Sequence, residues 1–461
     1  MIHKERTKIK LILETPPFGE KVVIWGWAKT ARSGKNVSFV ELNDGSSLNS
    51  LQVVIDSDKL DEYSKSRLLT GSCMRITGTV AESPGKGQSA ELQADSIEIV
   101  GPADEKFPIQ KKKHTMEYLR TVPHLRAKTN TFLAVFRMRN ELAFAVHNFY
   151  QERGFVYVHT PVITSSDAEG AGEMFRITTW DMDKITAENK YEASKDFFGK
   201  SAFLTVSGQL EGETFAQCFG EIYTFGPTFR AENSNTSRHV SEFWMIEPEM
   251  AFYDFDDLLE LAEDFIKYIT RHVWETCQPE IKLLTRFYEP ELENRYRTLM
   301  DNDFGRVTFH EALELLTPHS DKFEFQPSAE EGLFSEHEKL LSEEILGRPV
   351  FVTDYPKDIK AFYMRMNDDN ETVRCVDLLC PGIGEIIGGS QREERHDYLM
   401  KRVKEMGMDL SDYQWYLETR IWGSAPHSGF GLGFERMLVF LTGMKNIRDV
   451  IPFPRAVGQM Y

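Results

Sequence analysis

The stretch FRAENSNTSRHVSEFWMIEPEMAF, Phe229–Phe252, carries the most informative local pattern in the chain. The run IYTFGPTF, which leads into it, and the run FWMIEPEMAF, which closes it, are rich in apolar and β-favouring residues. Asn, Ser and Thr fill the segment between these two runs. Such a sequence predicts two antiparallel strands joined by a long polar loop.

The same hairpin carries the side chains that chemistry would need. Arg230 and Glu232 are two residues apart, so both would point to one face. A forked cation, further basic groups, an aromatic ring and carboxylates in one small volume suit a nucleoside triphosphate held beside a second substrate. A surface hairpin with solvated charges fits the pattern as well, so the rest of the chain must decide. The further basic groups of this hairpin are Arg238 and His239, in the loop. Glu242 and Phe243, at the start of the returning strand, supply a carboxylate and the aromatic ring.

Length and composition limit the possible classes of protein. The chain has 461 residues, which predicts at least two domains, and a net charge of −18. It has no apolar run of about 18 residues and no secretory signal pattern at its start, so we expect a cytoplasmic protein without a membrane span. Its 5 scattered cysteines argue against a disulfide framework. The acidic balance still permits a basic nucleic-acid-binding face, because binding depends on local charge.

The first part of the chain, residues 1–102, has the pattern of a small β-barrel. Five short strand-like runs, separated by Gly and Asn-Asp-Gly turns, lie between Lys21 and Val100. This spacing is typical of the five-stranded OB barrel, whose face commonly binds single-stranded nucleic acid. Phe39 could stack on an RNA base or could belong to the barrel core. The other candidate RNA-binding residues are Arg32, Lys35 and Gln52.

Residues 103–129 form the predicted linker. The sequence KFPIQKKKHTMEYLRTVPHLRAK combines prolines with a basic cluster in an otherwise acidic chain. It fits a hinge that lies against a phosphate backbone, and it equally fits a solvated run of charges.

Residues 130–461 mix helices and strands without strict β-α-β alternation. This mixture predicts an α+β domain on an antiparallel sheet flanked by helices. The segment from 279 to 348 is charged and mostly helical, and it has no chemical signature. The expected elements are helices at 130–153 and 254–277, and strands within 154–166, 349–356, 361–368 and 373–395.

Two groups near the end of the chain complete the candidate site. Asp377 and Glu385 flank a glycine-containing turn, and carboxylate oxygens beside a polyphosphate favour Mg²⁺. The later run HSGFGLGFERMLVFL places glycines, including Gly433, directly before a helix that carries Arg436. Glycines of this kind allow the backbone to approach a ligand closely.

Three separated segments resemble the signature motifs of class II aminoacyl-tRNA synthetases. The helix ending at Gly154 and the strand reaching Pro161 resemble motif 1, FRAE with its following strand resembles motif 2, and GLGFER resembles motif 3. With an N-terminal OB barrel, the resemblance covers nearly the whole chain and points to the aspartyl, asparaginyl and lysyl subgroup. It is greatest to the bacterial asparaginyl family, through GEIIGGSQREER and PHSGFGLGFERMLVFLTGMKNIRDVIPFPR.

The resemblance implies a reaction and the residues that carry it out. ATP and Mg²⁺ would activate L-asparagine as an adenylate, and the amino acid would then pass to tRNA(Asn). Arg230 would bridge the amino acid carboxylate and the α-phosphate, and Phe243 with Arg436 would sandwich adenine. Glu232, Arg238, His239 and Gly433 would hold the nucleotide, Asp377 and Glu385 would ligate Mg²⁺, and Glu169 and Gln209 would face the substrate ammonium and carboxylate.

The choice of amino acid depends on two further residues. Aspartyl relatives carry a Gln-Leu-Tyr-Lys run, whereas this chain reads Gln209-Leu210-Glu211-Gly212 and lacks the lysine. Arg392 would donate to a side-chain oxygen of the substrate, and Glu247 would accept from an NH₂ group. This pair favours an amide over a carboxylate, because Glu247 would repel the latter. Glu247 could otherwise be an ordinary strand carboxylate. This chain has Gly388 where aspartyl relatives often have serine. The lack of the serine side chain affects a second Mg²⁺ contact at this position.

Two alternatives stay open at this point. One is a non-discriminating aspartyl enzyme, which the missing lysine disfavours. The other is a non-catalytic RNA-binding paralogue, which would be expected to lose Arg230, Glu385 or Arg436. An ammonia-dependent asparagine synthetase would share the catalytic fold but lack the barrel. The motif 1 resemblance also implies a homodimer, because the family uses that helix and strand at its subunit interface.

Overall fold

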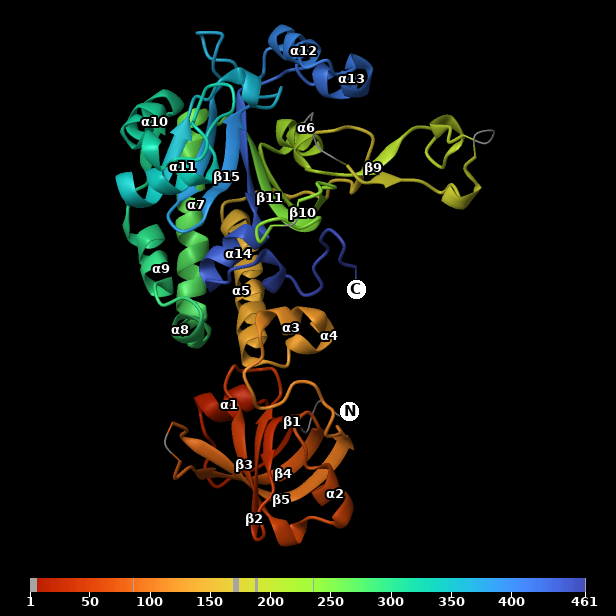
Figure 1. Cartoon of the computed structure of the whole chain (residues 1–461), viewed down its shortest axis with the longest axis vertical. Helices are drawn as coiled ribbons and strands as arrows, with labels where there is room; N and C mark the ends of the chain where they lie inside the picture. The colour runs from red at the N-terminus through yellow and green to blue at the C-terminus, as the bar shows by residue number, and fades with distance from the viewer. Residues whose placement is uncertain (1–5, 86, 169–173, 187–189, 235, 461) are drawn as a thin grey trace. The chain divides into compact units, whose positions relative to one another are not determined.

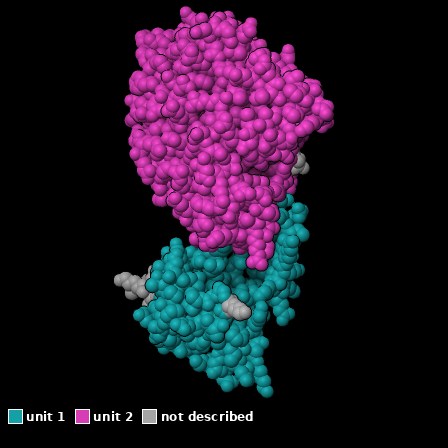
Figure 2. All heavy atoms as spheres, turned by 90° about the vertical axis from the view of Figure 1, so that its left-hand side faces the viewer, with its two compact units in different colours: residues 1–136 teal, residues 137–461 magenta. Residues whose placement is uncertain are grey.

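The computed structural model describes the chain except for residues 1–5, 86, 169–173, 187–189, 235 and 461. It divides into two compact units, Met1–Phe136 and Arg137–Tyr461, which Figure 2 draws in different colours.

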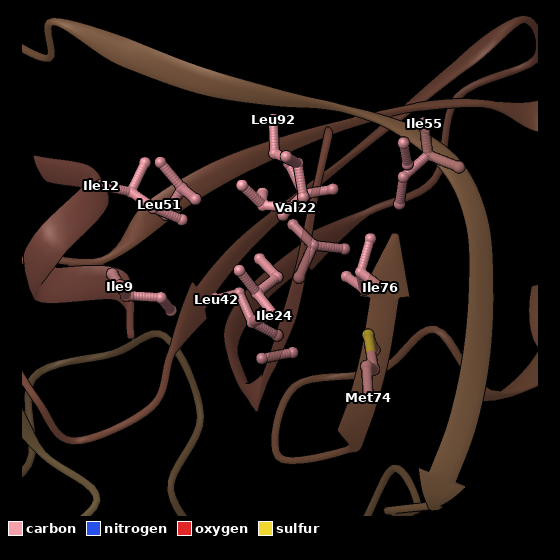
Figure 3. Close-up of a cluster of buried hydrophobic side chains, with 14 of the residues drawn as sticks. Ile9, Ile12, Val22, Ile24, Leu42, Leu51, Ile55, Met74, Ile76 and Leu92 are labelled. Atoms are coloured by element: carbon pink, nitrogen blue, oxygen red, sulfur yellow. The ribbon is translucent and has the colours of Figure 1, made fainter. Parts of the chain in front are cut away.

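The first unit contains a closed five-stranded barrel with strand order β1-β2-β3-β5-β4. Inward and outward residues alternate along its strands, so that one apolar set fills the interior (Figure 3). The core includes Ile24, Leu42, Val53, Ile76 and Leu92, all essentially inaccessible to solvent. The strands are β1 Lys21–Arg32, β2 Val37–Asn43, β3 Leu51–Asp56, β4 Cys73–Glu82 and β5 Ala90–Gly101.

Short helices complete this unit. α1 (Ile9–Glu14) places Ile9 and Ile12 in the barrel core, as Figure 3 shows. After the barrel, a separate small core of Ile109, Leu119 and Phe132 forms around the linker. The other helices are α2 Glu62–Arg67, η2 Ser57–Lys59, α3 Met116–Thr121, α4 Pro123–Arg126 and the start of α5 Asn130–Glu152.

The second unit is built on an eight-stranded sheet with the order β12-β13-β14-β15-β16-β11-β10-β6. Its six central strands pair antiparallel, whereas β12 with β13 and β6 with β10 pair parallel at the two edges. The predicted hairpin is β10 paired with β11, in a register that sets Phe229 opposite Glu242. The strands are β6 Val156–Tyr157, β10 Glu221–Phe229, β11 Glu242–Ala251, β12 Gly305–Thr308, β13 Val350–Thr353, β14 Cys375–Cys380, β15 Gly384–Gln391 and β16 His427–Gly433.

Helices cover one face of this sheet (Figure 1). α7 (Phe255–Thr276) contacts β15 and β16, and its Asp254 N-cap forms a reciprocal capping box with Asp257. α5 lies beside α7, where Phe149 meets Phe265 with ring centroids 5.0 Å apart. The other helices are α6 Gln209–Phe219, α8 Gln278–Phe287, α9 Leu292–Asp301, α10 Phe309–Leu316, α11 Ser335–Lys339, α12 His396–Glu405, α13 Leu410–Glu418 and α14 Phe434–Thr442.

Smaller elements lie beside the sheet. A three-stranded sheet of order β7-β9-β8 consists of β7 Ile163–Thr164, β8 Arg176–Ile177 and β9 Ala202–Leu204. The short helical turns are η3 Met182–Lys184, η4 Ala193–Lys195, η5 Thr317–Lys322, η6 Leu340–Ile345, η7 Lys357–Ile359 and η8 Ile447–Asp449, of which η6 is π-helical.

The predicted fold class, α+β with an OB barrel and an antiparallel sheet flanked by helices, is confirmed. Two predicted strands are wrong in detail. The strand expected to reach Pro161 is shorter, because only Val156–Tyr157 form β6, and β7 after the proline belongs to another sheet. Residues 361–368 form no strand and make only isolated bridges, at Met364 and Met366.

The cysteines are free thiols, and Cys277, Cys375 and Cys380 are buried. No helix within the described residues has both the length and the apolar character that crossing a bilayer requires.

Candidate active site

One cavity of about 480 Å³ lies on the large sheet, against β11, β14, β15 and β16. It is lined from segments far apart in sequence, including the β10–β11 hairpin and the start of α14. Of the candidate catalytic-domain residues, Glu169 lies outside the described residues. All the others line this cavity: Gln209, Arg230, Glu232, Arg238, His239, Phe243, Glu247, Asp377, Glu385, Arg392, Gly433 and Arg436.

The hairpin loop forms one wall of the cavity. The Arg230 guanidinium lies 5.5 Å from the centroid of the Phe243 ring and 4.0 Å from a Glu232 carboxylate oxygen. The loop is attached to the C-terminal segment, since the Ser241 amide donates to the Arg455 carbonyl and the Ile447 amide donates to the Ser237 carbonyl. Backbone bonds at these places hold the wall in position while its basic side chains face the cavity.

An acidic group occupies the opposite wall, on β14 and β15. Asp377 accepts two hydrogen bonds from Lys360 Nζ at 2.6 and 2.8 Å, and Arg436 lies 3.8 Å from the Glu385 carboxylate. Burial and the nearby charge of Asp377 raise the pKa of Glu385. Burial, with the charges of Glu385 and Asp377, likewise raises the pKa of Glu338 to about 7. A bound cation would reduce the repulsion between carboxylates that lie this close together.

The donor set fits Mg²⁺ shared with a ligand. In the described part of the chain, no group of three or more His, Cys, Asp or Glu side chains is arranged to bind a metal ion by itself. Mg²⁺ commonly takes one or two carboxylates and completes its shell with water and phosphate oxygens. Asp377 and Glu385 meet this requirement, because a Cβ at Gly388 would lie 3.4 Å from Glu385 Oε1 and 3.8 Å from Asp377 Oδ1. Both carboxylates therefore face one small space.

Glu247 lies deep in the cavity, with 5% of its surface exposed. It accepts hydrogen bonds from the Ser207 hydroxyl, from the Gly208 amide at 3.1 Å and from the Thr224 hydroxyl at 2.9 Å. Three donors support this carboxylate from the β9–α6 segment and from β10. The position of Glu247 is thus fixed before any ligand binds.

Arg392 is buried beneath the same region and forms a forked pair with Glu249. Its Nε donates to Glu249 at 3.0 Å, its Nη2 at 2.5 Å, and its Nη1 donates to Ser390 Oγ at 2.8 Å. Burial raises the pKa of Glu249 to about 8, against the effect of Arg392. A guanidinium has five N–H groups, so these bonds leave donors for a ligand.

A second buried network supports Arg392 and Gln209. Glu213 accepts from Arg420 Nη2 at 2.5 Å and from the Tyr416 hydroxyl at 2.8 Å, and His427 Nε2 lies 3.0 Å away. Burial works against the charge of Glu213, but Arg420 and His427 hold its pKa well below the usual range. Gln209 Nε2 donates to Glu213 at 3.0 Å.

Sequence reasoning missed these supporting residues. Glu249 had a signal, because it lies two residues from Glu247 and so on the same face of β11. Glu213 and Arg420 had none, since the hydrogen bond between them joins residues 207 positions apart.

The candidate RNA-binding residues lie on the barrel, in the other unit. Phe39 is 42% exposed, so it does not belong to the barrel core, and Arg32 pairs with it across β1 and β2. Arg32 and Lys35 are exposed, and Gln52, in β3, donates to Glu91 at 3.3 Å. Trp27 is a further exposed ring that the sequence did not single out, with Lys128 Nζ 4.9 Å from its centroid.

Comparisons with known families agree with this geometry. A family model described as tRNA synthetases class II (D, K and N) matches residues 115–457. A model described as an OB-fold nucleic acid binding domain matches residues 22–100. The chain therefore belongs to the class II tRNA synthetases of this group.

Individual relatives show which synthetases within this group the chain is similar to. The chain is 54% identical over 442 residues to the asparagine–tRNA ligase of Acetivibrio thermocellus, covering 95% of each, and 53% identical over 456 residues to that of Cytophaga hutchinsonii, covering 98% of each. It is also similar to the Pyrococcus horikoshii asparaginyl-tRNA synthetase structure complexed with asparaginyl-adenylate (TM-score 0.86, 30% identity, 99% of each chain). The chain belongs to the asparagine–tRNA ligase family.

Proposed function

We propose that this chain uses ATP to activate L-asparagine as asparaginyl-adenylate and transfers the asparaginyl group to the 3′ end of tRNA(Asn). AMP and diphosphate are the products. The observation that carries the proposal is the single cavity in which Arg230, Glu247, Glu385, Arg392 and Arg436 converge. The near full-length identity to asparagine–tRNA ligases supports it.

Activation needs positioning and charge neutralisation. An oxygen of the asparagine carboxylate attacks the α-phosphorus, and the bond from that phosphorus to the oxygen bridging to the β-phosphate breaks. Arg230 suits both the carboxylate and the α-phosphate, because its fork can contact two anions at once. Phe243 provides a ring for adenine on one side, and Arg436 provides a cation on the other. Glu232, Arg238, His239 and Gly433 line the rest of the nucleotide site.

Asp377 and Glu385 are the residues that would hold Mg²⁺. The ion supplies charge neutralisation for the departing diphosphate. Lys360 orients Asp377, since both carboxylate oxygens accept its hydrogen bonds.

Glu247 and Arg392 select the amide side chain. Arg392 donates to the side-chain oxygen, and Glu247 accepts from the NH₂ group. An aspartate in the same place would put a second carboxylate against Glu247, which costs free energy in a buried site. Gln209 contacts the ammonium and carboxylate end of the amino acid.

The remaining parts serve tRNA and assembly. Residues 1–102 bind the anticodon through Arg32, Lys35, Phe39 and Gln52, and residues 103–129 form a hinge against the phosphate backbone. Residues 130–461 are the catalytic domain. The enzyme acts in the cytoplasm as a homodimer, with α5 and the edge strand β6 at the interface, and the exposed Phe144 (57%) and Tyr157 (45%) support this choice.

An exchange assay tests the function. The full chain is incubated with ATP, Mg²⁺ and labelled diphosphate, with asparagine or aspartate as the amino acid. Label should enter ATP with asparagine and remain near background with aspartate. Equal or greater exchange with aspartate would identify a non-discriminating aspartyl enzyme, and no exchange with either would favour a non-catalytic paralogue.

A further inference from the structure

A second cavity, of about 310 Å³, adjoins the nucleotide site. The two cavities share Arg238, His239, Glu385 and Arg436 in their linings. In the proposed function Arg238 and His239 line the nucleotide site, Glu385 would hold Mg²⁺ and Arg436 lies against adenine, so all four belong to the ATP end of the first cavity. The second cavity therefore adjoins the ATP end of the first cavity, and neither Glu247 nor Arg392 is in its lining.

The cavity has two cations of its own, Arg295 from α9 and Lys445 after α14. They share one carboxylate: Arg295 Nη2 lies 2.7 Å from Glu289, and Lys445 Nζ also donates to Glu289. Burial works against the charge of Glu289, but Lys445 and Arg295 lower its pKa. One ionised carboxylate between two cations leaves a net positive charge at the cavity wall.

The rest of the lining includes the cation Arg238, the carboxylates Glu338 and Glu385, and apolar side chains. Among the described residues, Arg238 has no carboxylate within ion-pair distance, so its charge adds to that of Arg295 and Lys445. Glu338 lies beside Glu385 at the boundary of the two cavities, where its carboxylate accepts from the Glu385 amide at 3.2 Å. Phe440 and Met444 complete the lining, and apolar neighbours strengthen electrostatic attraction by excluding water.

The backbone is shaped to keep Arg295 in place. Gly382, in the turn between β14 and β15, has a φ of +91°, and a Cβ there would lie 3.2 Å from Arg295 Nε. A side chain at this position would press against the guanidinium. The turn thus leaves the space that Arg295 uses to reach both Glu289 and the cavity.

We propose that this second cavity is a binding site for inorganic diphosphate, which receives the leaving group after adenylate formation through Arg295 and Lys445. The inference rests on the proposed function. Diphosphate would shift from the shared residues Arg238 and His239 toward Arg295 and Lys445, without passing the asparagine side of the site. The negative charges of diphosphate would meet the guanidinium of Arg295 and the ammonium of Lys445, which are the usual partners of phosphate oxygens.

Direct titration tests the site. The full chain, with Mg²⁺ and at fixed ionic strength, is titrated with inorganic diphosphate in a calorimeter, and orthophosphate serves as the comparison ligand. The variants are Arg295→Ala, Lys445→Ala and the double variant. Arg297→Ala is the matched control, because Arg297 is exposed on the same helix and does not line the cavity. Arg295→Lys keeps the charge, and thermal unfolding checks that each variant is folded.

We expect the Kd for diphosphate to rise at least tenfold in the double variant, to change little in Arg297→Ala, and to be partly restored in Arg295→Lys relative to Arg295→Ala. The KM for ATP should change less than twofold. An unchanged diphosphate Kd in the folded double variant, or a KM for ATP that rises by the same factor, would overturn the proposal. Weaker binding of orthophosphate than of diphosphate is expected, and equal binding would also count against it.

Failure of the proposed function would give a different result. A chain that forms no adenylate from asparagine would show no exchange in the parent assay, whatever diphosphate does. The titration reads diphosphate binding without turnover, so it tests the second cavity in either case.

Discussion

Arg392 shows how burial determines what a residue can do. It is 2% exposed and is already paired with Glu249, so its position is set by the protein and not by the ligand. Breaking a buried pair from one side leaves an uncompensated charge. Glu247 is held by three neutral donors instead, so its negative charge is not neutralised by a neighbouring cation. In the proposed function, this difference makes Glu247 the residue that would distinguish an amide from a carboxylate.

Replacing Glu247 by glutamine should reduce discrimination between asparagine and aspartate. The variant keeps the size of the side chain and removes the charge that repels aspartate. We expect the ratio of kcat/KM for asparagine over aspartate to fall about 10- to 100-fold, roughly 1.4–3 kcal/mol. Diphosphate exchange with each amino acid measures the ratio, and the KM for ATP should stay within about twofold.

Thr224→Val is the matched control for this variant. It removes one hydrogen bond to Glu247 but keeps the carboxylate and its charge. If Thr224→Val lowered the ratio as much as Glu247→Gln, or if the latter left it unchanged, the selectivity assigned to Glu247 would be wrong.

At the scale of elements, the close approach of β16 to β11 makes room for the buried pair. A Cβ at Gly429 would lie 2.3 to 2.4 Å from the Glu249 carboxylate atoms. Such a distance cannot be tolerated, and both strands are held by pairing to their neighbours. Any side chain at Gly429 must therefore displace Glu249, and Arg392 with it.

Gly429→Ala should accordingly impair activation while the domain still folds. A displacement of about 1 Å at Arg392 can lower the rate roughly 100-fold. We expect asparagine-dependent exchange to fall by about that factor, with the larger part in the KM for asparagine. Gly226→Ala in β10 is the control, because no atom lies within 4 Å of its added Cβ. Normal exchange in Gly429→Ala would show that Glu249 does not position Arg392.

In the barrel, strand β1 carries a lysine whose charge opposes folding. Lys29 donates to the Lys128 carbonyl at 2.5 Å, and burial, with the charge of Lys128, lowers the pKa of Lys29 to about 8 from 10.5. Between these two pKa values the unfolded chain binds more protons than the folded one. The stability of the barrel should therefore rise as pH increases through this window.

Lys29→Met should remove that pH dependence. Each pKa unit is worth about 1.4 kcal/mol, so the parent should gain up to about 3 kcal/mol relative to the variant between pH 7.5 and 10.5. Hydrogen exchange of barrel peptides in urea measures the two free energies of unfolding without interference from the second unit. A parent-to-variant difference that is constant with pH would contradict the assigned cause.

At the scale of the whole molecule, two units carry separate tasks in the proposed function. The barrel presents exposed Phe39 and Trp27, whereas the second unit holds both cavities. The edge strand β6 pairs only with β10 in the described part of the chain, which leaves its other edge for a partner. An open edge beside exposed aromatic side chains is a suitable dimer surface.

The parent chain should therefore sediment at about twice its 53.2 kDa mass. Phe144→Glu places a charge on the exposed face of α5 and should shift the protein toward the monomer, with a matching loss of exchange activity. Analytical ultracentrifugation over a range of concentrations measures this change. Phe287→Glu, at an exposed position on α8, should leave the mass unchanged, and a monomeric parent would refute the assembly.

The amino-acid sequence by itself determined the local elements and the kind of chemistry. Strand-like runs between Gly and Asn-Asp-Gly turns predicted the barrel strands, and the helical period ending at Gly154 predicted α5. The polar loop between two apolar runs predicted the β10–β11 hairpin. These patterns depend on residues close in the chain, so they could be recognised without coordinates. The motifs FRAE and GLGFER could also be recognised without coordinates, because each is a short contiguous segment of the chain.

Only the tertiary structure decided which partners the site residues have. Arg392 pairs with Glu249 from 143 positions away, Glu213 with Arg420 from 207, and Arg295 shares a wall with Lys445 after α14. No local period records such pairs, because they depend on which strands become neighbours in the sheet and which helices cover it. The hairpin could be predicted from its own residues, whereas the buried support beneath Glu247 and the second cavity exist only once the sheet is assembled.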